Sequence, residues 1–229
     1  MNQVPIQIIA IDGTSSSGKG TVAYKIAEHF GFHYLNSGAL YRLVAHIAIT
    51  KRIPLDHEEA LVSIAQGLSV TFKGKQVIYE GVDVWPIIKG EENGKHASIV
   101  SRIVAVRDAL LDKQRSMAQT PGLVAEGRDM CTRVFTHAQI KIYLDADVTI
   151  RARRRLGEEI AAGNPASLEA MVNEIRERDH KDMNKDVGRL YPAQDAILVD
   201  NSNMTKEETL HTCITWCKQK GITSVKKVI

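Results

Sequence analysis

The segment IIAIDGTSSSGKGT, residues 8–21, predicts a buried strand, a glycine-rich loop and the start of a helix in direct succession. Apart from Gln7, residues 6–11 are apolar and rich in β-branched side chains, as in the buried strands of parallel sheets. The polar loop at residues 12–18 cannot continue that strand. From Lys19 the apolar residues recur at helical spacing, and Gly31 is placed to stop the helix.

The spacing Gly13-x-x-x-x-Gly18-Lys19 matches the phosphate-binding loop, in the strand-to-helix context that this motif requires. Glycines and small serines allow backbone N–H groups to form an anion-binding nest, to which the helix adds its positive N-terminal end. Lys19 would reach the outer phosphates as a point charge. Gly20 follows Lys19, so the hydroxyl that holds magnesium in GTPase-type loops is absent, which disfavours a switch protein.

Other short apolar runs predict further strands of a parallel sheet. Residues 123–125, 140–144 and 197–199 end at the acidic residues Glu126, Asp145 and Asp200, respectively. Buried runs that end in polar residues are typical of parallel strands whose ligands bind beyond their carboxyl ends. One more short strand is expected at residues 32–35.

Helical patterns begin near Gly38 and occupy residues 58–66, 97–117 and 205–220. Between them, alternating apolar residues on both sides of Lys73-Gly74-Lys75 predict a β-hairpin. Hairpins are foreign to a pure βα repeat, so we interpret residues 68–88 as part of an insertion. Residues 151–187 are polar and mostly helical, and we expect a mobile flap without a core of its own.

The composition fits one globular domain of 229 residues, with 44% hydrophobic and 25% charged residues. No apolar run approaches the roughly 18 residues of a membrane span, and we expect no signal peptide and no lipid anchor. The net charge of +3 is too small to indicate nucleic-acid binding by itself. We therefore expect a cytoplasmic protein, and a monomer because no long exposed apolar helix face stands out.

The cysteines Cys131, Cys213 and Cys217 form an odd set, which favours a reducing compartment over a disulfide framework. Cys213 and Cys217 lie one helical turn apart, but no further cysteine completes a zinc site. We interpret them as small buried hydrophobic residues.

The strongest local charge cluster consists of Arg151, Arg153, Arg154 and Arg155. A nucleic-acid patch is one interpretation, but no aromatic residue lies among these arginines to stack on bases. On a helix, Arg151, Arg154 and Arg155 share one face, and a lid that closes over nucleotide phosphates is the second interpretation. A solvated helix face is the third.

Several segments together resemble the bacterial cytidylate kinase family. They are residues 12–21, Asn36-Ser37-Gly38-Ala39-Leu40-Tyr41-Arg42, Gly127-Arg128-Asp129-Met130 and Arg178-Asp179-x-x-Asp182, in the family's order and spacing. The resemblance implies an α/β P-loop three-layer fold with a central parallel sheet, a small β-containing insertion that binds the nucleoside monophosphate, and a helical lid. The implied core is residues 1–38, 118–150 and 188–229, the monophosphate-binding region is 39–117, and the lid is 151–187.

The resemblance also implies transfer of the ATP γ-phosphate to CMP or dCMP, with Mg²⁺ entering as Mg-ATP. The acceptor phosphate is largely ionised at neutral pH, so no general base is needed, and we find no compelling candidate for one. The implied ATP-binding residues are Gly13, Thr14, Ser15, Ser16, Ser17, Gly18, Lys19, Gly20 and Thr21. The cations implied at the transferring phosphate are Lys19, Arg128, Arg154 and Arg178. The protein's own contacts to the metal stay undetermined.

The resemblance places the CMP-binding residues at Ser37, Tyr41, Arg42, Ser98, Arg107, Arg128, Asp129, Arg178, Asp182 and Lys185. Arg42 and Arg128 would hold the acceptor phosphate, and Arg178 with Asp182 the sugar hydroxyls and nearby phosphate. Asp129 suits the cytosine amino group, which donates a hydrogen bond, whereas it would repel the carbonyl that uracil offers there. Arg107 could donate to the acceptors O2 and N3 of cytosine.

The chain departs from the family pattern at three positions. Lys185 replaces an arginine and loses its bidentate fork, so we expect a looser grip there. Cys131 replaces a glycine, and our hypothesis is a thiol close to the monophosphate pocket. Thr14 replaces a proline, which we expect to add flexibility without altering the nest.

Three other functions remain as alternatives. One is a P-loop kinase for UMP or for a hydroxyl acceptor. Asp129 and Arg107 favour cytosine over these acceptors, and transfer to a hydroxyl group would also require a catalytic base. A nucleotide-binding regulator would not need arginines in three separated segments. A DNA- or RNA-binding protein is opposed by the near-neutral charge and the missing aromatics, so we expect no nucleic-acid partner and no membrane partner.

Overall fold

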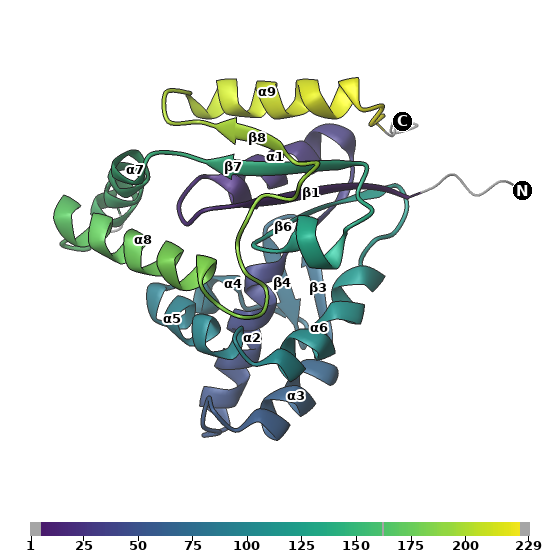
Figure 1. Ribbon diagram of the computed structural model, residues 1–229. Helices are drawn as coiled ribbons and strands as arrows, with labels where there is room; N and C mark the ends of the chain where they lie inside the picture. Colours follow the sequence, from purple (N-terminus) through teal and green to yellow (C-terminus); the bar gives the residue numbers. More distant parts are fainter. Residues whose placement is uncertain (1–5, 162, 225–229) are drawn as a thin grey trace, which may run out of the picture.

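The computed structural model describes residues 6–161 and 163–224, and its core is a five-stranded sheet in the order β2-β6-β1-β7-β8 (Figure 1). The strands are β1 (Gln7–Gly13), β2 (His33–Asn36), β6 (Gly122–Gly127), β7 (Ile140–Asp145) and β8 (Ile197–Asp200). Every neighbouring pair is parallel, which confirms the predicted sheet. The chain ends that we searched for a leader and a lipid anchor, residues 1–5 and 225–229, lie outside the described residues.

Helices cover both faces of this sheet and produce the expected three-layer α/β fold (Figure 1). One face packs on α1 (Lys19–Phe30) and α9 (Lys206–Gln219), and the other on α2 (Ser37–Thr50), α3 (Glu58–Gln66) and α6 (Val104–Ser116). Because successive strand residues point to opposite faces, Ile9 and Ile11 join the first core, and Ile8 and Ala10 the second.

The predicted end of α1 and the predicted burial of two cysteines on α9 are confirmed. Gly31 ends α1 in the left-handed conformation, with φ 72°. Cys213 and Cys217 on α9 are fully buried in the core shared with α1, as the interpretation of small hydrophobic residues requires.

The insertion contains the predicted hairpin, formed by β3 (Val70–Lys73) and β4 (Gln76–Tyr79), and a short third strand β5 (Val82–Asp83). A helical turn, α4 (Trp85–Ile88), follows it. The single helix expected at residues 97–117 is wrong. The chain forms α5 (Glu91–Val100) and then α6, with an extended residue, Ile103, at the start of α6. Apolar residues of both helices pack on the same core, so their spacing continues across the break.

The flap consists of α7 (Val148–Ala161) and α8 (Leu168–Met183), which lie beyond the carboxyl ends of the strands (Figure 1). The expectation that this segment lacks a core is wrong. Ala152, Met171 and Ile175 form a small buried cluster where α7 packs against α8. A few well-placed residues are sufficient because two helices bury only one narrow stripe each. In the part of the chain that the structure describes, no helix is long and apolar enough to cross a membrane.

Candidate active site

The carboxyl ends of the strands border a cavity of about 1050 Å³, whose walls come from the phosphate loop, α2, α5, the end of β6, α7 and α8. Asn36 of β2 lies beside Glu126 of β6, and Gly127 lies beside Asp12 of β1, so these three strands end together at the cavity. The predicted residues that line it are Ser15, Ser16, Lys19, Ser37, Tyr41, Arg42, Ser98, Arg107, Arg128, Asp129, Arg178, Asp182 and Lys185. The fold thus gathers residues that are far apart in the sequence into one site.

The phosphate loop follows β1 and leads directly into α1. A side chain at Gly13 is excluded, because its Cβ would lie 2.1 Å from the carbonyl oxygen of Leu144. Gly18, at φ 87°, precedes α1 without a side-chain cap, so the first N–H groups of this helix are available to an anion. Lys19 folds back over the loop and donates from Nζ to the carbonyl oxygen of Thr14 at 3.0 Å. Gly20 and Thr21 form the first turn of α1, and neither lines the cavity.

Positive charges crowd the centre of the cavity. Burial, followed by the charge of Arg128, lowers the pKa of Lys19 to about 7. Burial and the same neighbour lower the pKa of Arg178 to about 10. Among the described residues Arg178 has no ion-pair partner. Repulsion that the protein itself leaves uncompensated favours a bound polyanion.

Asp182 on α8 connects two further cations. Arg128 donates from Nε to Asp182 Oδ2 at 2.7 Å, and Lys185 Nζ lies 3.5 Å from Asp182 Oδ1. Burial raises the pKa of Asp182, but the charges of Arg128 and Lys185 outweigh it and lower the pKa to about 2. Lys185 lines the cavity with its side chain 9% exposed, so the position that replaces a family arginine points into the site.

Arg42 on α2 lies on another wall of the cavity, where it contacts the end of α4 and the start of α5. Its Nη1 donates to the carbonyl oxygens of Ile88 at 2.8 Å and Gly90 at 2.6 Å. Ser37 begins α2 so close to β6 that a Cβ on Gly127 would lie 2.3 Å from Ser37 Oγ.

Arg107 and Asp129 form a buried ion pair on the wall formed by α6 and the end of β6. Arg107 also donates from Nη1 to the carbonyl oxygen of Ser101 at 3.0 Å, and its guanidinium lies 5.3 Å from the ring centre of Tyr41. Gly188, at φ 65°, packs on this guanidinium so closely that a Cβ would lie 2.1 Å from Nη2. The Nε of Arg107 is buried without a hydrogen-bond partner among the described residues, so one donor beside the cavity is unused. Ser98 lines the same cavity from α5.

The structure gives Thr14 a contact that the expected flexibility did not include. Its hydroxyl donates to Asp145 Oδ1 at the end of β7 at 2.6 Å, which ties the loop to the sheet. Ser15 is held at both ends of its backbone: its N–H donates to Asp179 Oδ1 at 3.0 Å, and its carbonyl accepts from Arg151 Nη1 at 2.9 Å. Arg151 and Asp179 are themselves paired at 2.5 Å.

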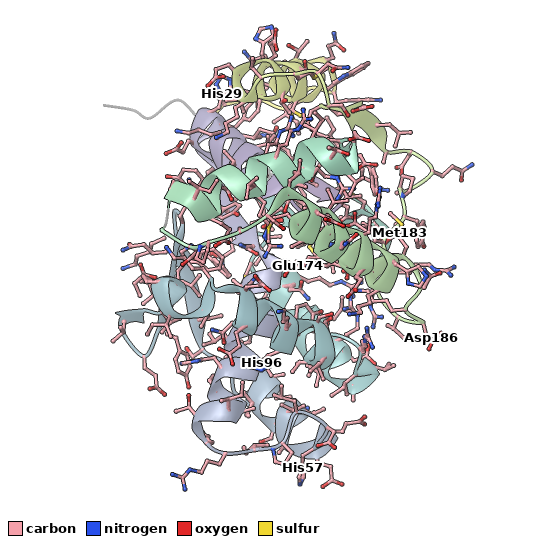
Figure 2. The ribbon with its side chains drawn as sticks, turned by 90° about the vertical axis from the view of Figure 1, so that its left-hand side faces the viewer. His29, His57, His96, Glu174, Met183 and Asp186 are labelled. Carbon is pink, nitrogen blue, oxygen red and sulfur yellow. The ribbon has the colours of Figure 1, made fainter. Side chains whose placement is uncertain are left out.

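The arginines of α7 do not act as one phosphate-facing surface. Arg151 is buried beneath the loop, and Arg154 donates to Asn201 rather than lining the cavity. Arg155 does line it, and its Nη2 lies 3.1 Å from Glu91 on α5 and 3.5 Å from Glu174 on α8. Figure 2 shows Glu174 of α8 above His96 of α5. Helical spacing predicts a shared face, but not which neighbour each long side chain reaches.

Cys131 is not close to the cavity surface, so the hypothesis of a pocket thiol is wrong. It is 2% exposed, in a π-helical turn (Met130–Val134) that follows β6. Its N–H donates to Asp12 Oδ2 at 2.8 Å, and the N–H of Met130 donates to Asp12 Oδ1 at 2.9 Å. Burial raises the pKa of Asp12 to about 6 and also raises the pKa of the Cys131 thiol.

Sequence reasoning assigned no role to three residues around the loop: Glu126, Asp179 and Asn201. Glu126 lines the cavity at 6% exposure, and a Cβ on Gly20 would lie 3.4 Å from its Oε1. Its place at the end of an apolar run was a usable signal. Among residues 6–161 and 163–224, no group of three or more histidine, cysteine or acidic residues is placed to hold a metal ion.

Comparison with known proteins identifies a family to which the chain is similar. A family profile described as cytidylate kinase matches residues 9–219. The chain is 45% identical over 222 residues to the cytidylate kinase of Pseudomonas paraeruginosa, covering 94% of this chain and 97% of that one. It is 44% identical over 211 residues to the cytidylate kinase of Bordetella pertussis, covering 92% and 95%, respectively. The crystal structure of TT1252 from Thermus thermophilus aligns with 95% of this chain and 98% of its own, with 19% identity and a TM-score of 0.48.

Proposed function

The chain belongs to the cytidylate kinase family, and from this premise we propose how its cavity performs the reaction. The protein is an ATP-dependent nucleoside monophosphate kinase that phosphorylates CMP and dCMP to CDP and dCDP, with release of ADP. An oxygen of the acceptor phosphate attacks the γ-phosphorus in line, and the bond to the β,γ-bridging oxygen breaks. ADP leaves with the electron pair of that bond.

ATP binds with its β- and γ-phosphates at the phosphate loop. The N–H groups of the loop and of the first turn of α1 donate to the phosphate oxygens, and the ammonium of Lys19 contacts the outer phosphates. The lowered pKa of Lys19 supports this role, because a buried ammonium among arginines is stabilised when an anion arrives.

CMP binds on the side of α2, α5 and α6. Arg42, Arg128 and Ser37 hold its phosphate, while Asp182 and Lys185 contact the sugar. Asp129 accepts from the cytosine amino group, and Arg107 donates to O2 and N3. Tyr41 and Ser98 complete the wall around the base.

The observation that carries the proposal is one cavity that joins cations without ion-pair partners among the described residues to the buried pair of Arg107 and Asp129. Lys19 and Arg178 lie on its phosphate side, and Arg107 and Asp129 line its opposite wall. Cations that already point at the transferring group stabilise the charge of the transition state without reorganising. The phosphate acceptor is already ionised, so no proton needs to be removed.

Magnesium enters as part of the substrate Mg-ATP, where it neutralises charge on the β- and γ-phosphates. The donor set fits an ion held through water, because the Glu126 carboxylate lines the cavity close to Gly20 and the described residues supply no group of ligands that could hold a metal directly. Glu126 has no ion-pair partner among the described residues. Its Oε1 accepts from the Tyr34 hydroxyl at 3.5 Å, so Oε2 is the oxygen left to accept from metal-bound water.

The proposed division is a core of residues 1–38, 118–150 and 188–229, a monophosphate-binding region of 39–117 and a lid of 151–187. The separate small cluster between α7 and α8 supports the lid as a unit. We further propose a monomer that works in the cytoplasm, where its nucleotide substrates are made, and that has no nucleic-acid partner.

The test is ADP release from Mg-ATP with CMP, dCMP, UMP, AMP, GMP or no acceptor. We expect turnover with CMP and dCMP far above every other acceptor. Preference for another nucleotide would overturn the assignment of Asp129 and Arg107. ATP binding without turnover on any acceptor would contradict the reaction and favour a nucleotide-binding regulator.

A further inference from the structure

We propose that Asn201, held by Arg154 of the lid helix α7, is a positioning residue for the phosphate loop. Asn201 follows β8 and is far from the loop in sequence. Its Nδ2 donates to the carbonyl oxygen of Ser17 at 3.0 Å. Arg154 thereby acts on the nucleotide through Asn201, not as a direct phosphate ligand.

Asn201 is fixed at every polar group that it carries. Its Oδ1 accepts from Arg154 Nη1 at 2.9 Å, its carbonyl accepts from Arg154 Nη2 at 2.7 Å, and its N–H donates to the carbonyl oxygen of Asp145 at 2.8 Å. The residue is 3% exposed. A buried amide with both ends of its side chain engaged has one orientation, because reversing it would place donor against donor.

The contact at Ser17 determines where the next N–H group points. In a trans peptide the C=O and the N–H of one plane point in opposite directions. Asn201 draws the carbonyl of Ser17 to the outer side of the loop, so the N–H of Gly18 is directed to the inner side. Arg151 acts in the same way two peptide planes earlier in the chain. It holds the carbonyl of Ser15 and so directs the N–H of Ser16. Two arginines of one helix thus set alternate peptide planes of the nest.

The position of Arg154 supports an indirect role. It does not line the cavity, whereas the next residue, Arg155, does. Both terminal nitrogens of Arg154 are occupied by Asn201. A side chain that is already committed to two acceptors would have to give them up to reach the γ-phosphate.

This inference rests on the proposed binding of ATP at the loop. It predicts which ligands lose affinity when Asn201 or Arg154 is replaced. The nest holds the β-phosphate, which ATP and ADP share, so a disordered nest weakens both. A direct contact from Arg154 to the γ-phosphate would affect ATP alone. CMP binds on the opposite wall and should not respond in either case.

The experiment measures dissociation constants of ATP, ADP and CMP by calorimetry for the wild type, Asn201→Ala, Arg154→Ala and the double variant. Loss of one net hydrogen bond predicts about tenfold weaker binding of both ATP and ADP in each single variant. The double variant should be no weaker than the worse single variant, because the residues act as one unit. CMP affinity should stay at the wild-type value.

Matched controls come from exposed neighbours. Asn203→Ala lies two residues beyond Asn201, and Arg153→Ala removes a charge from the same helix. Both should leave all three affinities unchanged. Asn201→Asp guards against a variant that fails to fold, since it retains the size and the acceptor for Arg154 but loses the donor to Ser17. It should weaken ATP and ADP as well.

Each contrary result has a definite meaning. Weakening of ATP alone in Arg154→Ala, or additive losses in the double variant, would overturn the relay and restore Arg154 as a phosphate ligand. Variants that bind ATP and ADP as the wild type does would overturn the inference while leaving the kinase intact. A wild type that fails to bind ATP would refute the proposed function itself.

Discussion

Because the pKa of Lys19 is lowered, we expect the dissociation constant of ATP to depend on pH. In the free protein, burial and the charge of Arg128 lower the pKa of Lys19 to about 7. Between phosphates the ammonium is stabilised, so its pKa returns towards the ordinary value of about 10.4. The bound state therefore carries a proton that the free state loses above about pH 7.

The pKa difference between the free and bound states sets how the dissociation constant of ATP changes with pH. Below about pH 7 Lys19 is charged in both states, and binding takes up no proton. Above it, binding must take up a proton, so the dissociation constant of ATP rises with pH. A free-state pKa of about 7 predicts roughly tenfold weaker binding at about pH 8 than at about pH 6. Close to one proton should be taken up per ATP at the higher pH.

The assay is calorimetry in buffers of different ionisation enthalpy, which counts the protons, with affinity measured at each pH. ATP itself titrates near the lower end of this range, so the matched control is Lys19→Arg. Arginine stays charged throughout, and ATP contributes equally to both proteins. The difference between the two pH profiles belongs to Lys19.

Parallel profiles for the wild type and Lys19→Arg, with no proton uptake, would refute the reasoning. They would mean that Lys19 is charged in the free protein despite its burial, and that the cation cluster does not destabilise it.

Three further predictions concern other walls of the cavity. Asp129→Asn replaces an acceptor by an amide that can also donate, so the preference for CMP over UMP should fall by about 10- to 100-fold in kcat/KM, and an unchanged ratio would contradict base reading by Asp129. Arg178→Ala should lower kcat by about 10²–10³, because it removes a cation with no partner among the described residues. Arg176→Ala, an exposed arginine on the same helix, is its control, and equal losses would count against a role at the phosphates. Glu126→Gln should raise the magnesium concentration for half-maximal velocity by about tenfold, and an unaltered magnesium titration would remove Glu126 from the metal-bound water.

Local patterns in the sequence predicted the sheet and the phosphate loop because each is specified by neighbouring residues. The run before Gly13 is apolar on both faces, and a strand with that pattern needs helices on both sides. The hairpin around Gly74 was predictable for the same reason, since alternation and a turn glycine are adjacent in the chain.

The ties that hold the loop were not predictable from such patterns. Asn201 is a lone polar residue in a loop, and only the order of β1, β7 and β8 in the sheet brings it to Ser17. Thr14 was expected to loosen the loop, but parallel pairing places Asp145 within reach of its hydroxyl. These contacts depend on tertiary register, which a motif does not encode.

The arginines of α7 illustrate the same limit within a single helix. Arg151 donates to the phosphate loop and Arg154 donates to Asn201, and Arg155 alone of the three lines the cavity. Spacing places all three on one side of α7. A long side chain can reach several neighbours, so its partner depends on what packs around the helix.

We propose that both substrates place their phosphates in one cation-lined cavity, in line for direct transfer. The most direct test is binding of a bisubstrate compound in which adenosine and cytidine are joined through a polyphosphate chain. We expect one compound to bind per chain, more tightly than ATP or CMP, and to be displaced competitively by each of them. Displacement by only one substrate, or binding of two compounds per chain, would contradict a single shared cavity.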